Sequence, residues 1–267
     1  MTIDSQVPAV MVFAGTDPSG GAGMQADIET LVSMGCHATP IITAVTVQDS
    51  VDVYRYQAME ASLVVEQARA IFEDIPVSAI KIGMLGSVEI IEVIHTLLVD
   101  YPHLPVVLDP VMTAGGGGVL ADDDIMDAMV NLLFPLTTVL TPNSEEARAF
   151  APEADSLDAC AQELLEHGCE FVLITGTHEN TPTVINSLYA ERQLLETYQW
   201  ERLTASYHGS GCTLAVAIAG LLSQGLDPMS AMREAQEYTW EALKNGYRIG
   251  MGQHIPNRLF WAHGEDS

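Results

Sequence analysis

Short apolar runs and longer amphipathic stretches alternate along most of the chain. A short apolar run that ends in glycine or proline is typical of a buried strand, while apolar residues three and four positions apart indicate a helix. This pattern predicts strands at residues 7–14, 37–46, 51–57, 79–82, 106–108, 139–141, 171–175, 183–189 and 193–198. It predicts helices at residues 22–34, 63–73, 88–99, 123–133, 144–150, 157–167, 213–223 and 229–247.

The order of these elements predicts the fold class. Strands that alternate with helices favour an α/β fold, with a mostly parallel central sheet that carries helices on both faces. Two exceptions are expected: a hairpin around Glu191 and Arg192, and an edge strand at residues 51–57. Because no repeat, low-complexity stretch or linker interrupts the pattern, residues 1–267 are expected to form a single domain.

Polar or otherwise unusual residues follow directly after many of the predicted strands. They are Asp17, Gln48, Met84, Asp109, Asn143 and Gly176. Ligands of open α/β sheets bind at the carboxyl ends of the strands. These positions therefore predict one binding site along one edge of the sheet.

The segment HGSGCT at residues 208–213 is the strongest candidate for chemistry. Its glycines run into an apolar helix, and the first amides of a helix lack partners within that helix. Such amides bind anions, phosphate groups in particular. Cys212 would stand at the positive end of the helix, where the pKa of a thiol falls. The segment indicates phosphoryl transfer, and the alternative is a glycine-rich loop that caps a core helix beside a buried cysteine.

Composition narrows the range of partners. The chain has 10 lysines and arginines against 36 aspartates and glutamates, and its net charge is −26. Nucleic acids and anionic membranes are poor partners for such a surface, whose acidity is also typical of adaptation to high salt. No apolar run is long enough to span a bilayer, residues 1–4 lack the basic start of a signal peptide, and the four cysteines show no C-x-x-C spacing. We therefore expect a cytoplasmic protein with reduced thiols.

Five motifs follow one another in an order that resembles the hydroxymethylpyrimidine and phosphomethylpyrimidine kinases of thiamin biosynthesis, in the ribokinase-like superfamily. The motifs are AGTDPSGGAG at residues 14–23, KIGML at 81–85, LDPVM at 108–112, TPNSEEA at 141–147 and HGSGCT at 208–213. The resemblance extends from about Ala9 to Tyr247. It implies a ribokinase-like fold, a homodimer, and phosphorylation of 4-amino-5-hydroxymethyl-2-methylpyrimidine and its monophosphate with ATP and Mg²⁺.

The resemblance implies roles at the acceptor end of the site. The implied anion hole, which would hold the transferring phosphate, consists of Gly209, Ser210, Gly211 and Cys212. Cys212 would also be the catalytic acid/base that accepts the hydroxymethyl proton. The residues implied to bind the pyrimidine are Gly15, Asp27, Gln48, Met84 and Val111. Among these, a carboxylate and an amide suit the hydrogen-bonding groups of an aminopyrimidine, and the others would line the ring pocket.

The resemblance also implies a metal and nucleotide end. Asp109 and Glu146 would hold Mg²⁺, in part through water, because this ion keeps some of its hydration shell. Asn143, Thr175 and Thr177 would lie beside the nucleotide.

Three lysines that the family usually carries are absent from this chain. Gly115, Thr175 and Ala205 stand in their places. Because lysines act as point charges on phosphates, their loss predicts a high KM for ATP, with only Mg²⁺ and the helix amides left to neutralise the phosphates. The glycine run at residues 115–118 predicts a mobile lid.

Two other functions stay open at this point. Pyridoxal is a similar ring with a hydroxymethyl group, so a pyridoxal-type kinase is the enzymatic alternative, although Asp27 together with Gln48 favours the aminopyrimidine. The other alternative is a degenerate paralogue that binds the pyrimidine without catalysis. The missing lysines support it, and the intact Cys212 argues against it.

Overall fold

The computed structural model describes residues 7–113 and 120–262, and within them nine strands form one continuous sheet. The strands are β1 (Ala9–Gly15), β2 (His37–Gln48), β3 (Val53–Ala58), β4 (Val77–Ile82), β5 (Val106–Leu108), β6 (Val139–Leu140), β7 (Phe171–Ile174), β8 (Thr183–Ala190) and β9 (Gln193–Glu201). Their order is β3-β2-β1-β4-β5-β6-β7-β8-β9. The strands from β2 to β7 pair in parallel, while β3 and the β8–β9 hairpin are antiparallel. The predicted mostly parallel sheet is confirmed.

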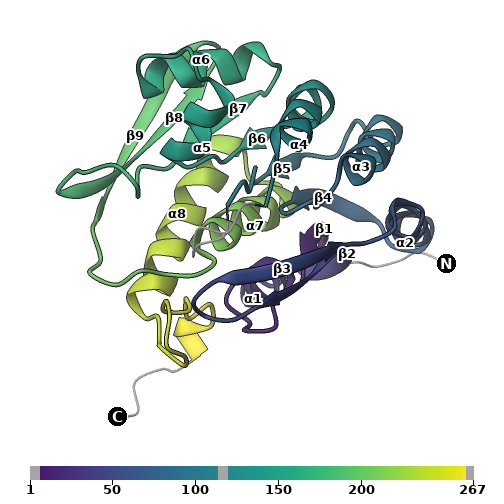
Figure 1. Ribbon diagram of the computed structural model, residues 1–267, viewed down its shortest axis with the longest axis horizontal. Helices are drawn as coiled ribbons and strands as arrows, with labels where there is room; N and C mark the ends of the chain where they lie inside the picture. The colour runs from purple at the N-terminus through teal and green to yellow at the C-terminus, as the bar shows by residue number, and fades with distance from the viewer. Residues whose placement is uncertain (1–6, 114–119, 263–267) are drawn as a thin grey trace.

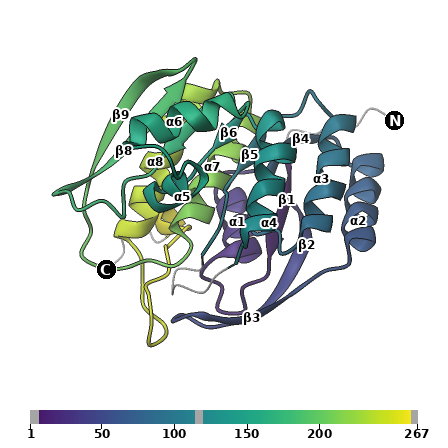
Figure 2. The same ribbon diagram turned by 45° about the horizontal axis from the view of Figure 1, so that its top comes forward.

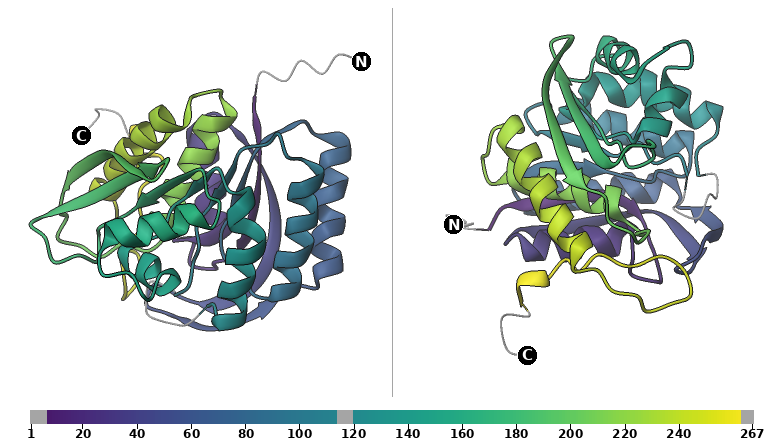
Figure 3. Two further views of the ribbon diagram at one scale, coloured as in Figure 1. Left: turned by 90° about the horizontal axis from the view of Figure 1, so that it is seen from above. Right: turned by 90° about the vertical axis from the view of Figure 1, so that its left-hand side faces the viewer.

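Helices cover both faces of this sheet (Figures 1 and 3). Those of the described residues are α1 (Gly23–Ser33), α2 (Ala61–Asp74), α3 (Val88–Asp100), α4 (Asp123–Ala128), α5 (Ser144–Phe150), α6 (Leu157–Glu166), α7 (Ser210–Ser223) and α8 (Pro228–Lys244). Neighbouring residues of β1 point to opposite faces, so Val12 joins the core beneath α1, α7 and α8, and Phe13 joins the core beneath α2 to α6.

Helix α7 lies against the centre of the sheet. Residues 213–221 of this helix are all buried, which suits a helix that is apolar on every side. It contacts β1, β4 and β5, and its amino end lies at the carboxyl ends of these strands. The apolar composition of α7 therefore directs its first, unpaired amides to the edge where ligands of α/β sheets bind.

Three helix boundaries differ from the prediction by three or more residues. Helix α7 begins at Ser210 and not at Thr213, because Gly209 adopts the left-handed conformation that starts the helix three residues earlier. Helix α8 ends at Lys244, before Asn245 and Gly246, rather than at Tyr247. The predicted helix at residues 123–133 is α4 followed by a π turn and a 3₁₀ turn that contains Pro135, a residue that cannot continue the α-helical hydrogen bonds.

The strand order changes direction beside β1, which is a topological switch point. The chain leaves β1 for β2 and β3 on one side and returns through β4 on the other. Figure 2 shows the β2–β3 arm extending past the sheet toward the C-terminal segment that follows α8. In the described residues, no helix has the length and apolarity that crossing a bilayer requires.

Candidate active site

A cavity of about 480 Å³ runs along the carboxyl ends of the parallel strands. Every site residue predicted from the sequence lines it except Asp27. The cavity therefore brings together the positions expected to bind the pyrimidine, the transferring phosphate, the metal and the nucleotide. The predicted positions thus lie together at one edge of the sheet, and their binding of ligands stays a prediction.

The predicted anion site corresponds to the first turn of α7. Gly209 begins the helix with φ 79°, and Ser210, Gly211 and Cys212 are its first residues. The first backbone amide that donates a hydrogen bond within this helix is that of Thr213, to the carbonyl oxygen of Gly209 at 3.0 Å. The three preceding amides therefore have no partner within the helix and lie beside the cavity, where they can bind a phosphate.

The anion site is packed backbone to backbone against the loop that follows β1. A Cβ atom on Gly209 would lie 2.0 Å from the carbonyl oxygen of Gly21. A Cβ atom on Gly21 would lie 2.4 Å from the ring of His208. Both glycines are thus required by close approach, and in Gly209 also by the positive φ. The two glycine-rich motifs of the sequence meet at this contact.

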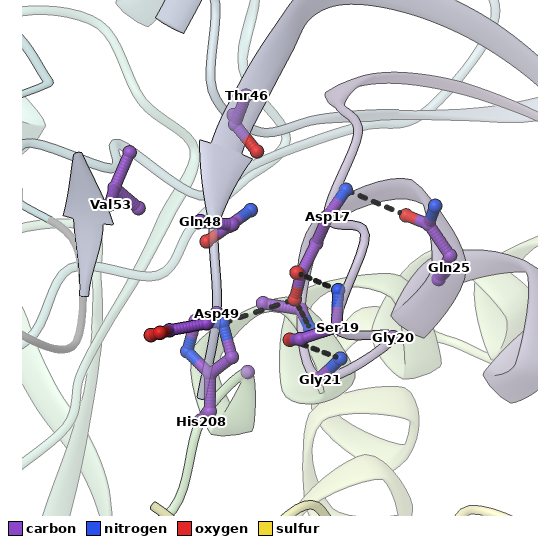
Figure 4. Close-up of polar contacts among 12 residues, drawn as sticks. Asp17, Ser19, Gly20, Gly21, Gln25, Thr46, Gln48, Asp49, Val53 and His208 are labelled. Carbon is purple, nitrogen blue, oxygen red and sulfur yellow. Dashed lines mark hydrogen bonds and ion pairs between the residues drawn. The ribbon is translucent and has the colours of Figure 1, made fainter. Parts of the chain in front are cut away.

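A close contact between the side chains of His208 and Asp17 reinforces this packing (Figure 4). The Nε2 atom of His208 lies 3.1 Å from Oδ2 of Asp17, which also accepts from the amide of Ala22 at 2.7 Å, while Oδ1 accepts from the amide of Ser19 at 2.8 Å. Burial opposes the ionised form of Asp17, but these bonds outweigh it and lower the pKa of the carboxyl. Asp17 thus holds its own loop and the residue before Gly209 together.

The pyrimidine end of the cavity is lined by β2 and by the segments after β1 and β4. The amide nitrogen of Gln48 donates to the carbonyl oxygen of Thr16 at 3.2 Å, which leaves its oxygen free to accept from a ligand. Met84 lies close to Gly15: a Cβ atom added to Gly15 would be 3.0 Å from the sulfur of Met84. Gly15, Met84 and Val111 line the cavity, and Gln48 is a polar side chain beside them; their contacts with a pyrimidine stay a prediction.

Asp27 is not on the cavity surface. Its Oδ2 atom accepts from Nζ of Lys81 at 2.9 Å, and both side chains are fully buried. Its Oδ1 atom has no hydrogen-bond partner among the described residues. The structure therefore gives Asp27 a role that the sequence analysis did not foresee, which is to hold Lys81, and its predicted contact with the pyrimidine stays a prediction.

Lys81 is the main site residue that sequence reasoning missed. It lines the cavity from β4 and lies close to Cys212 and Asp109. Burial alone would lower its pKa, but Asp27, Cys212 and Asp109 outweigh burial and raise that pKa. The signal was a single lysine in the otherwise apolar strand of residues 79–82, because a buried lysine needs an anionic partner. Lys81 thus adds a buried positive charge near the predicted anion site, which the expectation of only Mg²⁺ and helix amides did not include.

Two carboxylates face the cavity next to the anion site. A Cβ atom on Gly211 would lie 3.6 Å from Oδ2 of Asp109. Burial raises the pKa of Asp109 to about 6, although Lys81 acts in the opposite direction. Burial, and then repulsion by Asp109, raise the pKa of Glu146 to about 8. A divalent cation would relieve both effects, so this pair fits the predicted Mg²⁺.

The amino end of α5 fixes the position of Glu146. Its Oε2 atom accepts from the amide of Asn143 at 2.9 Å, and Oδ1 of Asn143 accepts from the amides of Glu145 and Glu146, a reciprocal cap. Since that oxygen is committed to the cap, Asn143 has its NH₂ group to offer a ligand. It therefore suits a phosphate oxygen better than a metal ion.

The environment of Cys212 contradicts one expectation. Burial raises the pKa of its thiol to about 12, since Asp109 and Asp27 add to the effect of burial and Lys81 only partly offsets it. The sequence predicted a lowered pKa from the helix terminus alone. It did not foresee the two buried carboxylates that the fold brings to the same place.

The nucleotide end is built from loops. Thr175 and Thr177 line the cavity after β7, and Ala205 lines it before the anion site. Arg202 donates to the carbonyl oxygens of Thr177, Glu179 and Thr181, which holds the loop from outside the cavity. Two of the three positions without lysine thus face the cavity. Gly115 and the predicted lid at residues 115–118 lie outside the described residues.

Comparison with known proteins agrees with this geometry. The phosphomethylpyrimidine kinase family matches the chain over residues 17–257. The chain belongs to this family. A hydroxymethylpyrimidine/phosphomethylpyrimidine kinase of Synechococcus elongatus is 36% identical over 252 residues, which cover 92% of this chain and 95% of that protein. The resemblance found in the sequence is confirmed, and this family member is a phosphotransferase.

Solved structures support the ribokinase-like fold. The pyridoxal kinase of Staphylococcus aureus in complex with AMP-PCP and pyridoxal has a TM-score of 0.86 and 26% identity, covering 97% of this chain and 96% of its own. The phosphomethylpyrimidine kinase of Clostridium difficile has a TM-score of 0.77 and 31% identity, covering 89% of this chain and 100% of its own. The kinase is thus similar in sequence to pyrimidine kinases and in backbone shape to pyridoxal kinases as well.

Proposed function

We propose that this kinase phosphorylates the hydroxymethyl group of 4-amino-5-hydroxymethyl-2-methylpyrimidine, and then its monophosphate, with ATP as the donor. The observation that carries the proposal is the single cavity, in which Gln48 and Met84 line one end and the first turn of α7 lines the middle. A ring bound at the first end would present its hydroxymethyl group to the anion site. Positioning of this kind supplies much of the catalysis in phosphoryl transfer.

The residues around the anion site have separable roles in this proposal. The amides of residues 210–212 stabilise the charge on the transferring phosphoryl group, and Lys81 adds a buried positive charge beside them. Cys212 lies where it could accept the proton of the hydroxymethyl group. A thiolate with so high a pKa is a strong base but is scarce at neutral pH, and the positive charge of Lys81 beside it favours its formation.

Asp109 and Glu146 would hold Mg²⁺ in this scheme. Among the described residues no group of three or more metal-ligating side chains occurs, which suits an ion that needs one or two carboxylates together with water and phosphate oxygens. When bound, Mg²⁺ neutralises phosphate charge. The two carboxylates orient it, and Asn143 donates to the phosphates.

Turnover of the hydroxymethylpyrimidine with ATP, measured with and without Mg²⁺, tests the proposal. Both the monophosphate and the diphosphate should form, and omission of Mg²⁺ should abolish both products. Binding of the pyrimidine without consumption of ATP would reject catalysis and favour a pyrimidine-binding protein.

Pyridoxal is the second candidate acceptor, because the backbone resembles that of a pyridoxal kinase at a TM-score of 0.86. Gln48 favours the aminopyrimidine, since its free oxygen can accept from an amino group that pyridoxal lacks. Competition between the two acceptors separates these functions. Preferential phosphorylation of pyridoxal would overturn the pyrimidine assignment.

We also propose that the enzyme is a cytoplasmic homodimer that pairs through the β2–β3 arm. The arm exposes Val45, Val47 and Tyr54, which a second copy would cover. The four cysteines of the described residues form no disulfide bond, which suits a reducing compartment such as the cytoplasm.

Sedimentation equilibrium tests the dimer. Val47→Glu should convert the dimer to a monomer, and a monomeric wild type would reject the proposed dimer.

A further inference from the structure

The segment after α8 is attached to both sides of the active site. The amide of His254 donates to the carbonyl of Ser206, and the amide of His208 donates to the carbonyl of His254, each at 2.9 Å. On the other side, the amide of Gln253 donates to the carbonyl of Ser50, in the turn that follows Gln48. This C-terminal segment therefore lies between the residues that precede the anion site and the arm that carries Gln48 (Figure 2).

Arg258 closes this segment onto the two glycine loops. Its side chain is fully buried, although arginine is seldom buried in proteins without several partners. The guanidinium donates to the carbonyl oxygens of Gly20 and Gly21, to the hydroxyl of Thr213 at 3.0 Å, and to Glu29 at 3.0 Å. One side chain thus holds the loop after β1, helix α1 and the first turn of α7.

The contact with Thr213 passes directly to the anion site. The hydroxyl of Thr213 accepts from Nε of Arg258 and donates to the carbonyl of Gly209 at 2.8 Å. Gly209 in turn touches the backbone at Gly21, whose carbonyl accepts from the same guanidinium. Arg258 therefore bonds directly to Gly21, and through the hydroxyl of Thr213 to Gly209, from outside the cavity.

We propose that Arg258 is a positioning residue for phosphoryl transfer. Its planar group has donors at fixed angles, and two neighbouring carbonyls and a hydroxyl define the distance between the loop after β1 and the amides of residues 210–212. Lysine has a single ammonium and cannot bond to all of these partners at once. The inference rests on the proposed function only in requiring that the cavity transfers a phosphoryl group to a bound acceptor.

Arg258→Gln is the decisive variant, with Arg233→Gln as the matched control on the exposed face of α8. We expect kcat to fall at least about tenfold in Arg258→Gln while the KM for the pyrimidine changes less than about threefold, because a displaced anion site slows the chemical step more than binding. The control should keep both constants. Arg258→Lys should recover only part of the lost kcat, and guanidinium ions should partly restore the activity of Arg258→Ala.

Stability is measured in parallel, so that a general structural effect is recognised. The proposal is wrong if kcat of the folded Arg258→Gln enzyme stays within about threefold of the wild-type kcat. It is also wrong if a lowered kcat recovers to the wild-type value when the variant is assayed at temperatures below its melting transition. If that variant does not fold, Thr213→Val removes only the hydroxyl between Arg258 and Gly209, and unchanged kcat there overturns the proposal equally. These assays use as acceptor whichever of hydroxymethylpyrimidine and pyridoxal the wild type phosphorylates. An error in the proposed acceptor is therefore detected with the wild type and does not affect the test of Arg258.

Discussion

The two ends of the cavity are constructed differently. At the acceptor end, the glycine loops touch through their backbones, and the buried groups of Asp17, His208 and Arg258 hold them in place. At the donor end, Thr175 and Ala205 line the cavity from loops, and the positive charge of Arg202 is turned to carbonyl oxygens of the protein. Acceptor geometry is thus specified by packing, whereas donor binding depends on a few groups at an open rim.

Charge follows the same division. Lys81 is the one lysine or arginine among the described residues that line the cavity, and it lies at the anion site rather than at the rim. In the proposed function, the chain thus keeps a cation beside the predicted anion site and has none among the described residues that line the predicted triphosphate site. This difference predicts that changes at the two ends will separate catalysis and stability from donor affinity.

Lys81→Met should have the largest effect. It leaves the carboxylate of Asp27 buried without its partner, which costs about 3–5 kcal/mol in the free energy of unfolding. Chemical denaturation measures this loss, and Lys244→Met is the control at an exposed site. Pairing Lys81→Met with Asp27→Leu should restore stability but not turnover. Full turnover in that double variant would show that Lys81 has no part in the chemistry.

Cys212→Ala should lower kcat about 10²-fold if the thiolate is the general base, with little change in pyrimidine affinity. In the wild type, kcat should also rise with pH through the range from about 7 to 10, because the thiolate fraction grows as pH approaches a pKa of about 12. Cys169→Ala, a buried cysteine in the core, is the control for stability. A Cys212→Ala enzyme within about threefold of wild type leaves only the amides as the catalytic element.

Thr175→Lys should lower the KM for ATP, and so strengthen the weaker end of the cavity. A charge-assisted hydrogen bond to a phosphate contributes roughly 1.5–3 kcal/mol, and Thr175 lines the cavity where the family usually has lysine. Thr197→Lys adds the same charge on an exposed position of β9 and should leave the KM unchanged. An unchanged KM in the folded Thr175→Lys enzyme would place the triphosphate elsewhere.

Gln48→Ala should weaken pyrimidine binding by about 1–3 kcal/mol, the usual cost of an unpaired polar group, and should leave the KM for ATP nearly constant. Calorimetric titration with the pyrimidine measures this loss. Gln57→Ala, on the exposed side of the neighbouring strand, provides the control. Equal losses for the pyrimidine and ATP would contradict the division of the cavity into two ends.

The smallest expected effect is on the pH dependence of Mg²⁺ binding. In the absence of the ion, the pKa of Asp109 is about 6 and that of Glu146 is about 8, so protons compete with the metal below these values. The affinity for Mg²⁺ should therefore rise with pH between about 6 and 8 and level off above that range. Calorimetry at several pH values tests this, and Glu146→Gln should flatten the dependence. A constant affinity would exclude these carboxylates as ligands.

The sequence predicted the order of strands and helices because alternating burial is a local property of each segment. It also predicted the residues at strand ends, since a parallel sheet brings those ends to one edge. It did not predict the ion pair of Lys81 with Asp27 or the contact of His208 with Asp17, whose partners are far apart along the chain. Nor did it predict the raised pKa of Cys212, which arises from burial and from carboxylates supplied by two other elements.

The contact between Gly21 and Gly209 also bears on how such an enzyme can diverge. Substitutions at Thr175 or Ala205 alter side chains at the edge of an open cavity, so they can accumulate one at a time. At Gly21 or Gly209 any added carbon atom meets a buried ring or a carbonyl group, so a single substitution there forces backbone movement. Lineages of this kinase should therefore drift in their affinity for the phosphate donor long before they alter the packing of the anion site.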